Sequence, residues 1–432
     1  MNLKSSRRML LVSGFASNFH LIGGLLIPFY TIWGKITEGQ VFLLQALFMT
    51  SLWLFEVPTG FVADRYGRKV SIAIGTLIAG IGFCVYSLKA DLRVFAIAEI
   101  TVALGASLIS GADKALIRAV VFADSSVNNA FVPKKYRFQL LTWIVGLIRA
   151  LFYPKEDDLA EKAATFYRNY RLVKMMALLI ATPLGSMIAG KFGLQIPMRL
   201  MIIPFVTASI LILFVHEPRM IEAPTENHLV NKVHPLAGFR LLRVDKPLTI
   251  IALDKAIVQA SGVVGLWLYQ GLLLDLGFQP TVFGWIHAFA VAIEIVIIAF
   301  ALKISQIKGG RRRYLYISTW IPGIGFGFGV LAILLKTTVL GLVAGVLMPI
   351  LVIGFALSRE PYFYKIENHG LDEKSRATVL STIQMFSQAG TVIMYLLVGQ
   401  GVGQHKVWVF AIMALILIIW RLFVRLPERT NE

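Results

Sequence analysis

Several charged side chains of this 432-residue chain stand inside long apolar runs, where they can bind protons or pair with one another. Glu294 and His287 are seven residues apart, close to two helical turns, so on a helix both point the same way, about 10 Å apart. A carboxylate and an imidazole on one inward face can carry a proton. The alternative is that Glu294 caps a buried polar network and His287 only packs. Glu99 and Asp113, at a spacing of fourteen, share a helix face in the same way and are also proton-coupling candidates.

Charges of this kind are expensive in a membrane, because each costs roughly 2.5–3.5 kcal/mol near the bilayer centre. Most of them must therefore face a cavity or a partner. The chain places nine charged residues in such runs: Glu56, Glu99, Asp113, Lys114, Asp254, Lys255, Glu294, Arg359 and Glu360. We expect Asp254, Lys255, Arg359 and Glu360 to act as gate ion pairs or to line a cavity. Static structural pairing is the alternative, above all for Lys114 and Arg359.

The elements that must hold these side chains are membrane spans. Hydrophobic residues make up 57% of the chain and charged residues only 15%, with a mean hydropathy of +0.73. A soluble domain carries about a quarter of its residues as charged ones. The composition therefore excludes soluble enzymes, nucleic-acid binders and disordered proteins. The single cysteine, Cys84, leaves no internal disulfide and no cysteine metal site.

Crossing the hydrocarbon core takes about 20 apolar residues, and the sequence has twelve such runs. They fall near 9–33, 40–63, 70–89, 94–121, 172–190, 198–215, 248–274, 281–303, 313–335, 338–362, 376–400 and 405–424. We predict an all-α polytopic membrane protein with a six-helix bundle over 1–215, a cytoplasmic linker over 216–247 and a second six-helix bundle over 248–432. The halves repeat each other weakly, since Gly67-Arg68-Lys69 after the second span matches Gly310-Arg311-Arg312 after the eighth.

Charge placement supports this count. The 42 Lys and Arg residues outnumber the 24 Asp and Glu, which gives a net charge of +18. With both termini inside, most basic residues fall in cytoplasmic loops, as the positive-inside rule requires. Six fall in external loops: Lys35, Lys89, Arg93, Lys191, Lys336 and Lys406. The stretch 124–171 is predicted to be a cytoplasmic insert, either an interfacial amphipathic helix around Phe138–Tyr153 or an ordinary structured loop.

One motif lies at the cytoplasmic end of the second span, where residues 60–69 read Gly-Phe-Val-Ala-Asp-Arg-Tyr-Gly-Arg-Lys. Gly60 allows a neighbouring helix to approach closely, and Gly67 permits a tight turn. Asp64 can meet a basic residue or a facing helix N-terminus. Arg65, Arg68 and Lys69 hold the loop at the membrane surface. A merely basic short loop, the plainer alternative, gives no reason for the glycines and the aspartate.

The motif resembles the signature G-x-x-x-D-R-x-G-R-K of the major facilitator superfamily and matches it in full. Residues 55–60, 110–113 and 376–381 also look like the bacterial and archaeal multidrug-type branch. The resemblance implies the twelve-helix major facilitator fold, a latch at this motif in the outward-facing state, and a central cavity lined by spans 1, 4, 7 and 10. Lys114, Arg118 and Ala119 depart from the pattern of that branch.

Uncharged polar and aromatic residues supply further cavity candidates in spans 1, 7 and 11. These are Asn18, His20, Gln259, Trp267, Gln384 and Gln388. Helix packing explains each of them nearly as well.

The sequence predicts a secondary active transporter that works by alternating access and exports a small organic molecule against an inward proton flow. The alternatives are an energy-independent facilitator, a nutrient importer and a lipid flippase. No residue pattern supports catalysis, a bound metal or a cofactor. The expected partners are the solute, protons and the lipid bilayer, without nucleic acid. We expect a monomer in the cell (inner) membrane with both termini in the cytoplasm.

Overall fold

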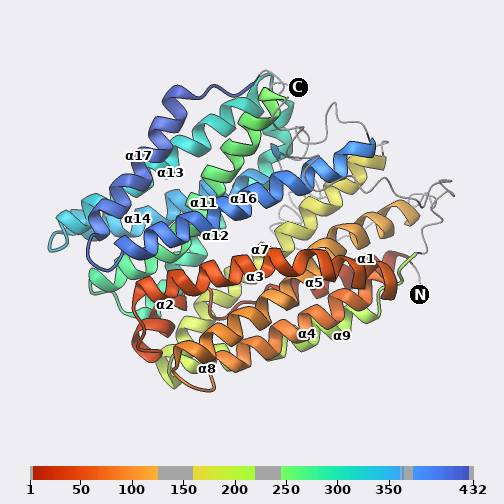
Figure 1. The fold of residues 1–432 in the computed structure, drawn as a ribbon, viewed down its shortest axis with the longest axis horizontal. Coiled ribbons are helices and arrows are strands. Elements are labelled where there is room, and N and C mark those ends of the chain that lie inside the picture. Colours follow the sequence, from red (N-terminus) through yellow and green to blue (C-terminus); the bar gives the residue numbers. More distant parts are fainter. Residues whose placement is uncertain (1–2, 125–158, 219–244, 361, 364–372, 428–432) are drawn as a thin grey trace, which may run out of the picture.

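The computed structural model describes residues 3–124, 159–218, 245–360, 362–363 and 373–427, and these form helices joined by turns (Figure 1). In this part of the chain, eleven helices are long and apolar enough to cross a membrane. The predicted all-α multi-pass fold is confirmed. The elements are α1 (Leu3–Ser17), α2 (Leu26–Pro28), a π-helical turn (Phe29–Trp33), α3 (Glu38–Tyr66), α4 (Arg68–Tyr86), α5 (Leu92–Asp124), α7 (Leu159–Phe192), α8 (Gln195–Leu200), α9 (Ile202–Leu213), α11 (Lys246–Asp275), α12 (Pro280–Gln306), α13 (Gly310–Leu334), α14 (Val339–Ala356), a 3-10 turn (Leu357–Arg359), α16 (Glu373–Gly401) and α17 (Lys406–Phe423).

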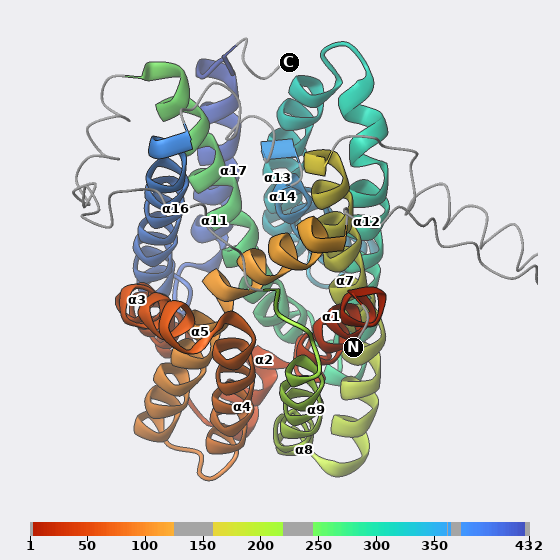
Figure 2. The ribbon, with the colours of Figure 1, turned by 90° about the vertical axis from the view of Figure 1, so that its right-hand side faces the viewer.

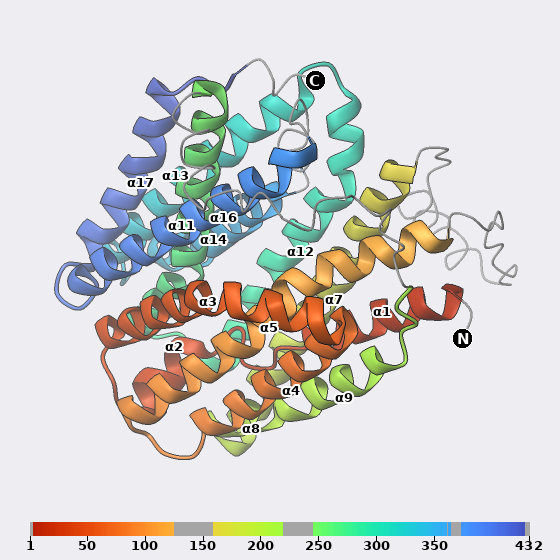
Figure 3. The same ribbon diagram turned by 45° about the vertical axis from the view of Figure 1, so that its right-hand side comes forward.

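The helices form two groups, α1–α9 and α11–α17, which we call the first and second groups (Figures 1 and 2). We call the end of the molecule where α1 begins and α17 ends the termini end, and the opposite end the far end. In Figure 3 the two groups lie together at the lower left, at the far end, and spread apart toward the termini end. Large apolar side chains on the outside are exposed, such as Phe423 at 81% and Val339 at 77%, as expected for lipid-facing positions.

The first span is broken, although the sequence predicts a continuous helix over 9–33. After α1 the chain turns through residues 18–25 before α2 and the π-helical turn. Gln270 of α11 takes over the freed backbone groups: Ile27 N donates to its Oε1 at 3.0 Å, and its Nε2 donates to Gly23 O at 3.3 Å. Unwound backbone at membrane depth is tolerated where protein groups satisfy it in this way. One side chain of the second group thus holds the break in the first.

Glycines bring the two groups into backbone contact between α7 and α12. Gly284 N donates to Ser186 Oγ at 2.9 Å, and Thr182 Oγ1 donates to Gly284 O at 3.2 Å. A Cβ added to Gly284 would overlap the carbonyl of Thr182, and one added to Gly24 would press on the backbone of Gly284. Small residues allow membrane helices this close approach.

An ion-pair triad joins the groups at the far end. Lys406 Nζ, in the first turn of α17, lies 2.8 Å from Glu38 Oε1 of α3 and 2.5 Å from Asp275 Oδ2 of α11. Gly39 and Gly399 pack against each other beside it. The far end is therefore held shut by contacts between α3 and the second group.

The structure changes one boundary of the predicted insert and leaves most of the predicted linker undescribed. Residues 159–171 belong to α7 and not to the insert predicted over 124–171, because the helix of the fifth span begins at Leu159. The interfacial helix expected around Phe138–Tyr153 lies outside the described residues. So does most of the linker predicted over 216–247, and the division into bundles over 1–215 and 248–432 stays a prediction.

Candidate functional site

A cluster of buried charges crosses between the two groups, and Arg171 of α7 is its centre. Arg171 Nη2 lies 3.2 Å from Glu294 Oε1 of α12 and donates to Leu357 O at 2.9 Å. Its Nη1 forms an ion pair with Glu360, which follows α14. Tyr167, one turn earlier on α7, donates to Glu360 Oε1 at 3.3 Å. We call Arg171, Glu294, Glu360 and Tyr167 the bridging cluster.

The bridging cluster contains two predicted residues and two, Arg171 and Tyr167, that sequence reasoning missed. Glu294 is a proton-coupling candidate and Glu360 a gate candidate, whereas Arg171 was assigned to the insert. The available signal was helical spacing, because Tyr167, Arg171 and Lys174 follow one another at intervals of four and three residues. The Glu294 side chain is only 4% exposed and Arg171 18%, so the pair is largely screened from water.

His287 and Glu294 have separate partners despite their shared helix. The His287 ring lies with its Nδ1 3.0 Å from the hydroxyl of Tyr269 on α11. A Cβ on Gly23 would stand 3.9 Å from its Nε2. His287 therefore faces the broken first span, while Glu294 faces Arg171. Among the described residues, no hydrogen bond joins His287 directly to Glu294.

The first group contains a second buried carboxylate, Glu99 on α5, which is 2% exposed. Tyr30 Oη and Gln45 Nε2 each donate to its Oε1 at 2.7 Å. Both donors are neutral and come from the π-helical turn and α3. Trp267 of α11 lies beside Tyr30, with ring centroids 6.4 Å apart. Glu99 thus lies near the boundary between the groups, but its hydrogen bonds stay within the first.

Asp113, the other candidate on α5, lies 3.7 Å from the ammonium of Lys174 on α7. Both residues belong to the first group. Lys114, beside Asp113, is exposed, and Glu56 on α3 is half-buried. The structure therefore separates Glu99 from Asp113 and gives each its own partner.

Asp254 and Arg359 do form an ion pair, but it does not lie between the groups. Asp254 Oδ1 also accepts from Trp420 Nε1 at 2.9 Å and from Arg421 Nη1 at 3.2 Å. All four residues belong to the second group, and Asp254 is fully buried. The expected gate role of Asp254 and Arg359 requires contact with the first group, which these bonds do not provide. Lys255 lies over the ring of Phe363, again within the second group.

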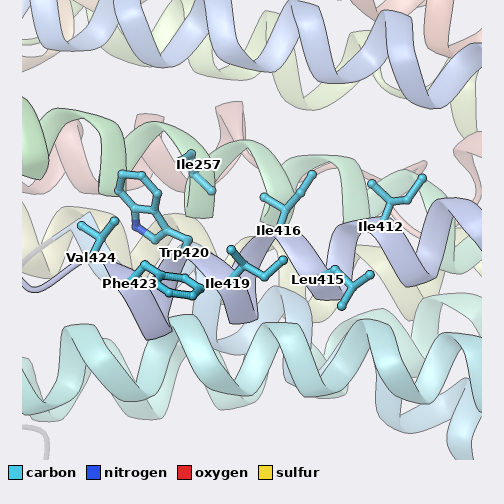
Figure 4. A pocket seen from close by; sticks show the side chains of 8 residues that line it. All are labelled: Ile257, Ile412, Leu415, Ile416, Ile419, Trp420, Phe423 and Val424. Atoms are coloured by element: carbon cyan, nitrogen blue, oxygen red, sulfur yellow. The ribbon is translucent and has the colours of Figure 1, made fainter.

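Two surface hollows lie on the second group. One is an apolar groove between α11 and α17, lined by Ile257, Ile412, Leu415, Ile416, Ile419, Trp420, Phe423 and Val424 (Figure 4). The other lies at the start of α13 and is lined by Gly309, Arg312, Arg313, Tyr316 and Ile317. Among the described residues, no group of three His, Cys, Asp or Glu side chains is placed to hold a metal ion.

Comparison with known proteins gives structural matches only. No protein-family model and no curated protein matches the sequence. Among solved structures, the nucleoside transporter NupG aligns with a TM-score of 0.66, 13% identity and 98% of each chain covered, and a mutant of it aligns at 0.71 and 14%. The D-xylose-proton symporter aligns at 0.68, with 14% identity and 100% of each chain covered. The chain has the major facilitator fold.

Within the part of the major facilitator fold that the structure describes, no contact joins the signature motif to the second group. Gly60 is exposed, with no atom within 4 Å of a Cβ built on it, and Asp64 and Arg65 are exposed as well. Arg68 N and Lys69 N donate to the two carboxylate oxygens of Glu217, at 3.0 and 3.2 Å, from the turn after α9. Glu217 is a functional candidate that the sequence analysis did not single out.

The neutral candidates take different places in the major facilitator fold. Asn18 and His20 lie in the break of the first span, where Asn18 donates to Gly14 O at 3.1 Å and His20 packs edge-on against Phe83 and Phe205. Gln259 on α11 accepts from Ser387 on α16 at 3.4 Å. Gln384 is half-buried. Gln388 is 7% exposed, and its Oε1 has no hydrogen-bond partner among the described residues.

Proposed function

We propose that this chain is a secondary active transporter that moves a small organic solute by alternating access and couples the movement to protons. The observation that carries the proposal is the bridging cluster, in which Arg171 of the first group pairs with Glu294 and Glu360 of the second. A rocking motion of the two groups must break these bonds. A proton on Glu294 removes one of the two negative partners of Arg171, so proton binding and the motion act on the same contact.

The closed far end and the uncovered motif support a state that is open toward the termini end. The triad around Lys406 holds the far end, while at the termini end Asp64 is exposed and no described atom lies within 4 Å of a Cβ built on Gly60. We assign the termini end to the cytoplasm of a cell, because most of the Lys and Arg residues in the described part of the chain lie at that end. With this assignment, the structure is open toward the cytoplasm. The signature motif, expected to act as a latch in the outward-facing state, is then released, as an inward-open state requires.

The uncharged groups between α11 and α16 support a polar, neutral solute. The buried Oε1 of Gln388 has no donor among the described residues, and an unpaired buried acceptor favours a ligand that supplies one. Gln259 and Trp267 lie on the neighbouring α11. Import by symport is a second candidate, since one structure of similar fold is a D-xylose-proton symporter. Export is supported only by the resemblance of residues 55–60, 110–113 and 376–381 to the multidrug-type branch.

Proteoliposomes that contain the purified protein and an internal pH dye test the proposal. A panel of neutral, cationic and anionic solutes is added outside, and we expect one class to evoke a pH change. Glu294→Gln is expected to abolish the pH change, while solute exchange without a gradient persists. Glu99→Gln is the matched comparison, because it removes a buried carboxylate whose hydrogen bonds do not cross between the groups.

Asp91→Asn is the control for loss of one negative charge, since Asp91 lies in a surface turn and its side chain binds Arg93 N. This variant should behave as the wild type. Proton movement that survives in Glu294→Gln and is lost in Glu99→Gln would place the coupling site within the first group. A protein that is folded and inserted but moves no solute and no proton would contradict the proposal as a whole.

A further inference from the structure

The start of α13 concentrates positive charge at the termini end of the second group. Arg311, Arg312 and Arg313 follow one another in its first turn. The Arg311 side chain is only 5% exposed, yet its Nε has no hydrogen-bond partner and the residue forms no ion pair among the described residues. A buried guanidinium without a counter-ion is unfavourable, because it loses water and gains nothing in return. An anion close to the start of α13 would offset this cost.

The corresponding helix of the first group shows where such an anion binds. Gly67 and Gly309 both have a positive φ, of 98° and 69°, although their ψ angles differ at 147° and 7°. Ser71 N donates to Gly67 O at 3.1 Å, just as Arg313 N donates to Gly309 O at 3.0 Å. The two helix starts therefore align one residue earlier than the sequence match of Gly67 with Gly310.

At the start of α4, the carboxylate of Glu217 accepts from two successive backbone N–H groups. The equivalent pair at the start of α13 is Gly310 and Arg311. Gly310 N already donates to Ile307 O at 2.7 Å. The N–H groups of Arg311 and Arg312 have no acceptor among the described residues. This turn thus binds an anionic group in the first group of helices, whereas the described residues supply none to the equivalent turn of the second group.

The surroundings of this turn are cationic, and the described residues that line the hollow include no carboxylate. The hollow is lined by Gly309, Arg312, Arg313, Tyr316 and Ile317. Arg421 lies over the Tyr316 ring, 4.1 Å from its centroid, and Lys303 and Lys308 are exposed nearby in the chain. Of the carboxylates described on the helices that adjoin α13, Asp254 is held by Arg359 and Arg421, and Glu294 is held by Arg171.

We propose that this hollow binds the phosphate of an anionic phospholipid through Arg312, Arg313 and the free N–H groups at the start of α13. Guanidinium groups bind phosphate with two parallel hydrogen bonds, and a helix N-terminus adds N–H donors and a favourable dipole. A lipid is favoured over a soluble anion because the hollow lies at the end of a membrane span, next to the exposed apolar side chain of Ile317. Basic pockets between spans on the cytoplasmic side bind such headgroups. The inference does not depend on transport.

Native mass spectrometry of the purified protein, titrated with phosphatidylglycerol or phosphatidylcholine, tests the site. The wild type should retain phosphatidylglycerol preferentially. Arg312→Gln combined with Arg313→Gln should weaken the tightest phosphatidylglycerol adduct about tenfold or more, since charged hydrogen bonds are lost. The matched control combines Arg8→Gln with Lys246→Gln, which removes the same charge from exposed positions at the same end. This control should leave that adduct unchanged.

A second variant, Arg311→Met, separates binding from folding. It should reduce phosphatidylglycerol retention, and in phosphatidylcholine nanodiscs its Tm should match or exceed that of the wild type, because a buried unpaired charge is gone. Equal losses in the two double variants would show a general charge effect and overturn the site.

Two further results would assign the site to another anion. If inorganic phosphate raises Tm in phosphatidylcholine nanodiscs as much as phosphatidylglycerol does, the ligand is a soluble anion and not a lipid. Glu428 follows α17 in sequence much as Glu217 follows α9. If Glu428→Gln raises phosphatidylglycerol affinity tenfold, the chain supplies its own anion, and the proposal is wrong.

Discussion

Two clusters of buried charge in this molecule use the same chemistry in different places. In the inner cluster, Asp254 binds Arg359, Arg421 and Trp420, all within the second group. In the bridging cluster, Arg171 binds Glu294 and Glu360 across the two groups. Asp254 is fully buried, whereas Glu360 is 38% exposed and gives the bridging cluster access to water. In the proposed rocking motion, only a cluster that crosses the boundary between the groups has bonds that must open.

The largest effect is expected in the inner cluster. Asp254→Asn leaves Arg359 and Arg421 buried beside each other without a counter-ion, and breaking a buried pair in this way costs about 3–5 kcal/mol. We expect a sharp loss of folded protein, measured as Tm and as the monodisperse fraction in detergent. A variant with wild-type Tm would show that the inner cluster is not structural and would remove the contrast between the clusters.

In the bridging cluster, Arg171→Gln should keep the fold and lose coupling. Glu294 then has no cation to pair with, so its protonation no longer changes a bond between the groups. Solute accumulation driven by a pH gradient should fall at least tenfold, with Tm near that of the wild type. Arg171→Lys keeps the charge and should restore part of the accumulation. If Arg171→Gln unfolds as Asp254→Asn does, the two clusters are alike after all.

The triad at the far end extends the comparison to a contact near the surface. Lys406→Gln removes both ion pairs, and partly exposed pairs of this kind contribute about 1 kcal/mol or less each. We expect the population open at the far end to rise several-fold. Spin labels at Leu88→Cys and Val339→Cys, in a Cys84→Ser background, report this as longer distances, because the labelled turns belong to different groups. An unchanged distance distribution would exclude the triad as a lock.

The smallest effect is expected for Tyr167→Phe, which removes one long hydrogen bond to Glu360 and leaves the ion pairs of Arg171 in place. A hydrogen bond of this kind contributes about 0.5–1.5 kcal/mol. The transport rate should change by a small factor, and its pH dependence should stay that of the wild type. A pH profile displaced as far as that of Glu294→Gln would instead put the proton site at Glu360.

The sequence predicts the spans well because a membrane helix is recognised directly as a long run of apolar residues. It also identifies Glu294, Asp254 and Arg359 as buried charges, since a charge in an apolar run has few alternatives. The sequence does not predict which of these charges pair with one another. Asp254 pairs with Arg359 from a distant span, and the partner of Glu294 depends on how α7 packs against α12. Arg171 stands just outside its apolar run, so hydropathy alone assigns it to a loop.

The break in the first span shows a second limit of the sequence. Gly23 and Gly24 weaken a helix, but apolar residues on both sides make the run read as continuous. What stabilises the break is Gln270, a residue of the second group whose own span gives no sign of this role. The predicted shared face of His287 and Glu294 holds for one helix, yet the neighbouring helices give the two side chains different partners.

The position of the glycine contact between α7 and α12 determines how far the ends of these helices would move for a given tilt. Thr182, which touches Gly284, stands roughly 35 Å along α7 from Leu159 at the termini end. A tilt of about 10° at this contact displaces the outer turns of that helix by about 6 Å. In the proposed rocking motion, Gly24 and Gly284 lie at the pivot, so a methyl group added to either glycine would cause its largest displacement at the outer turns of the helices.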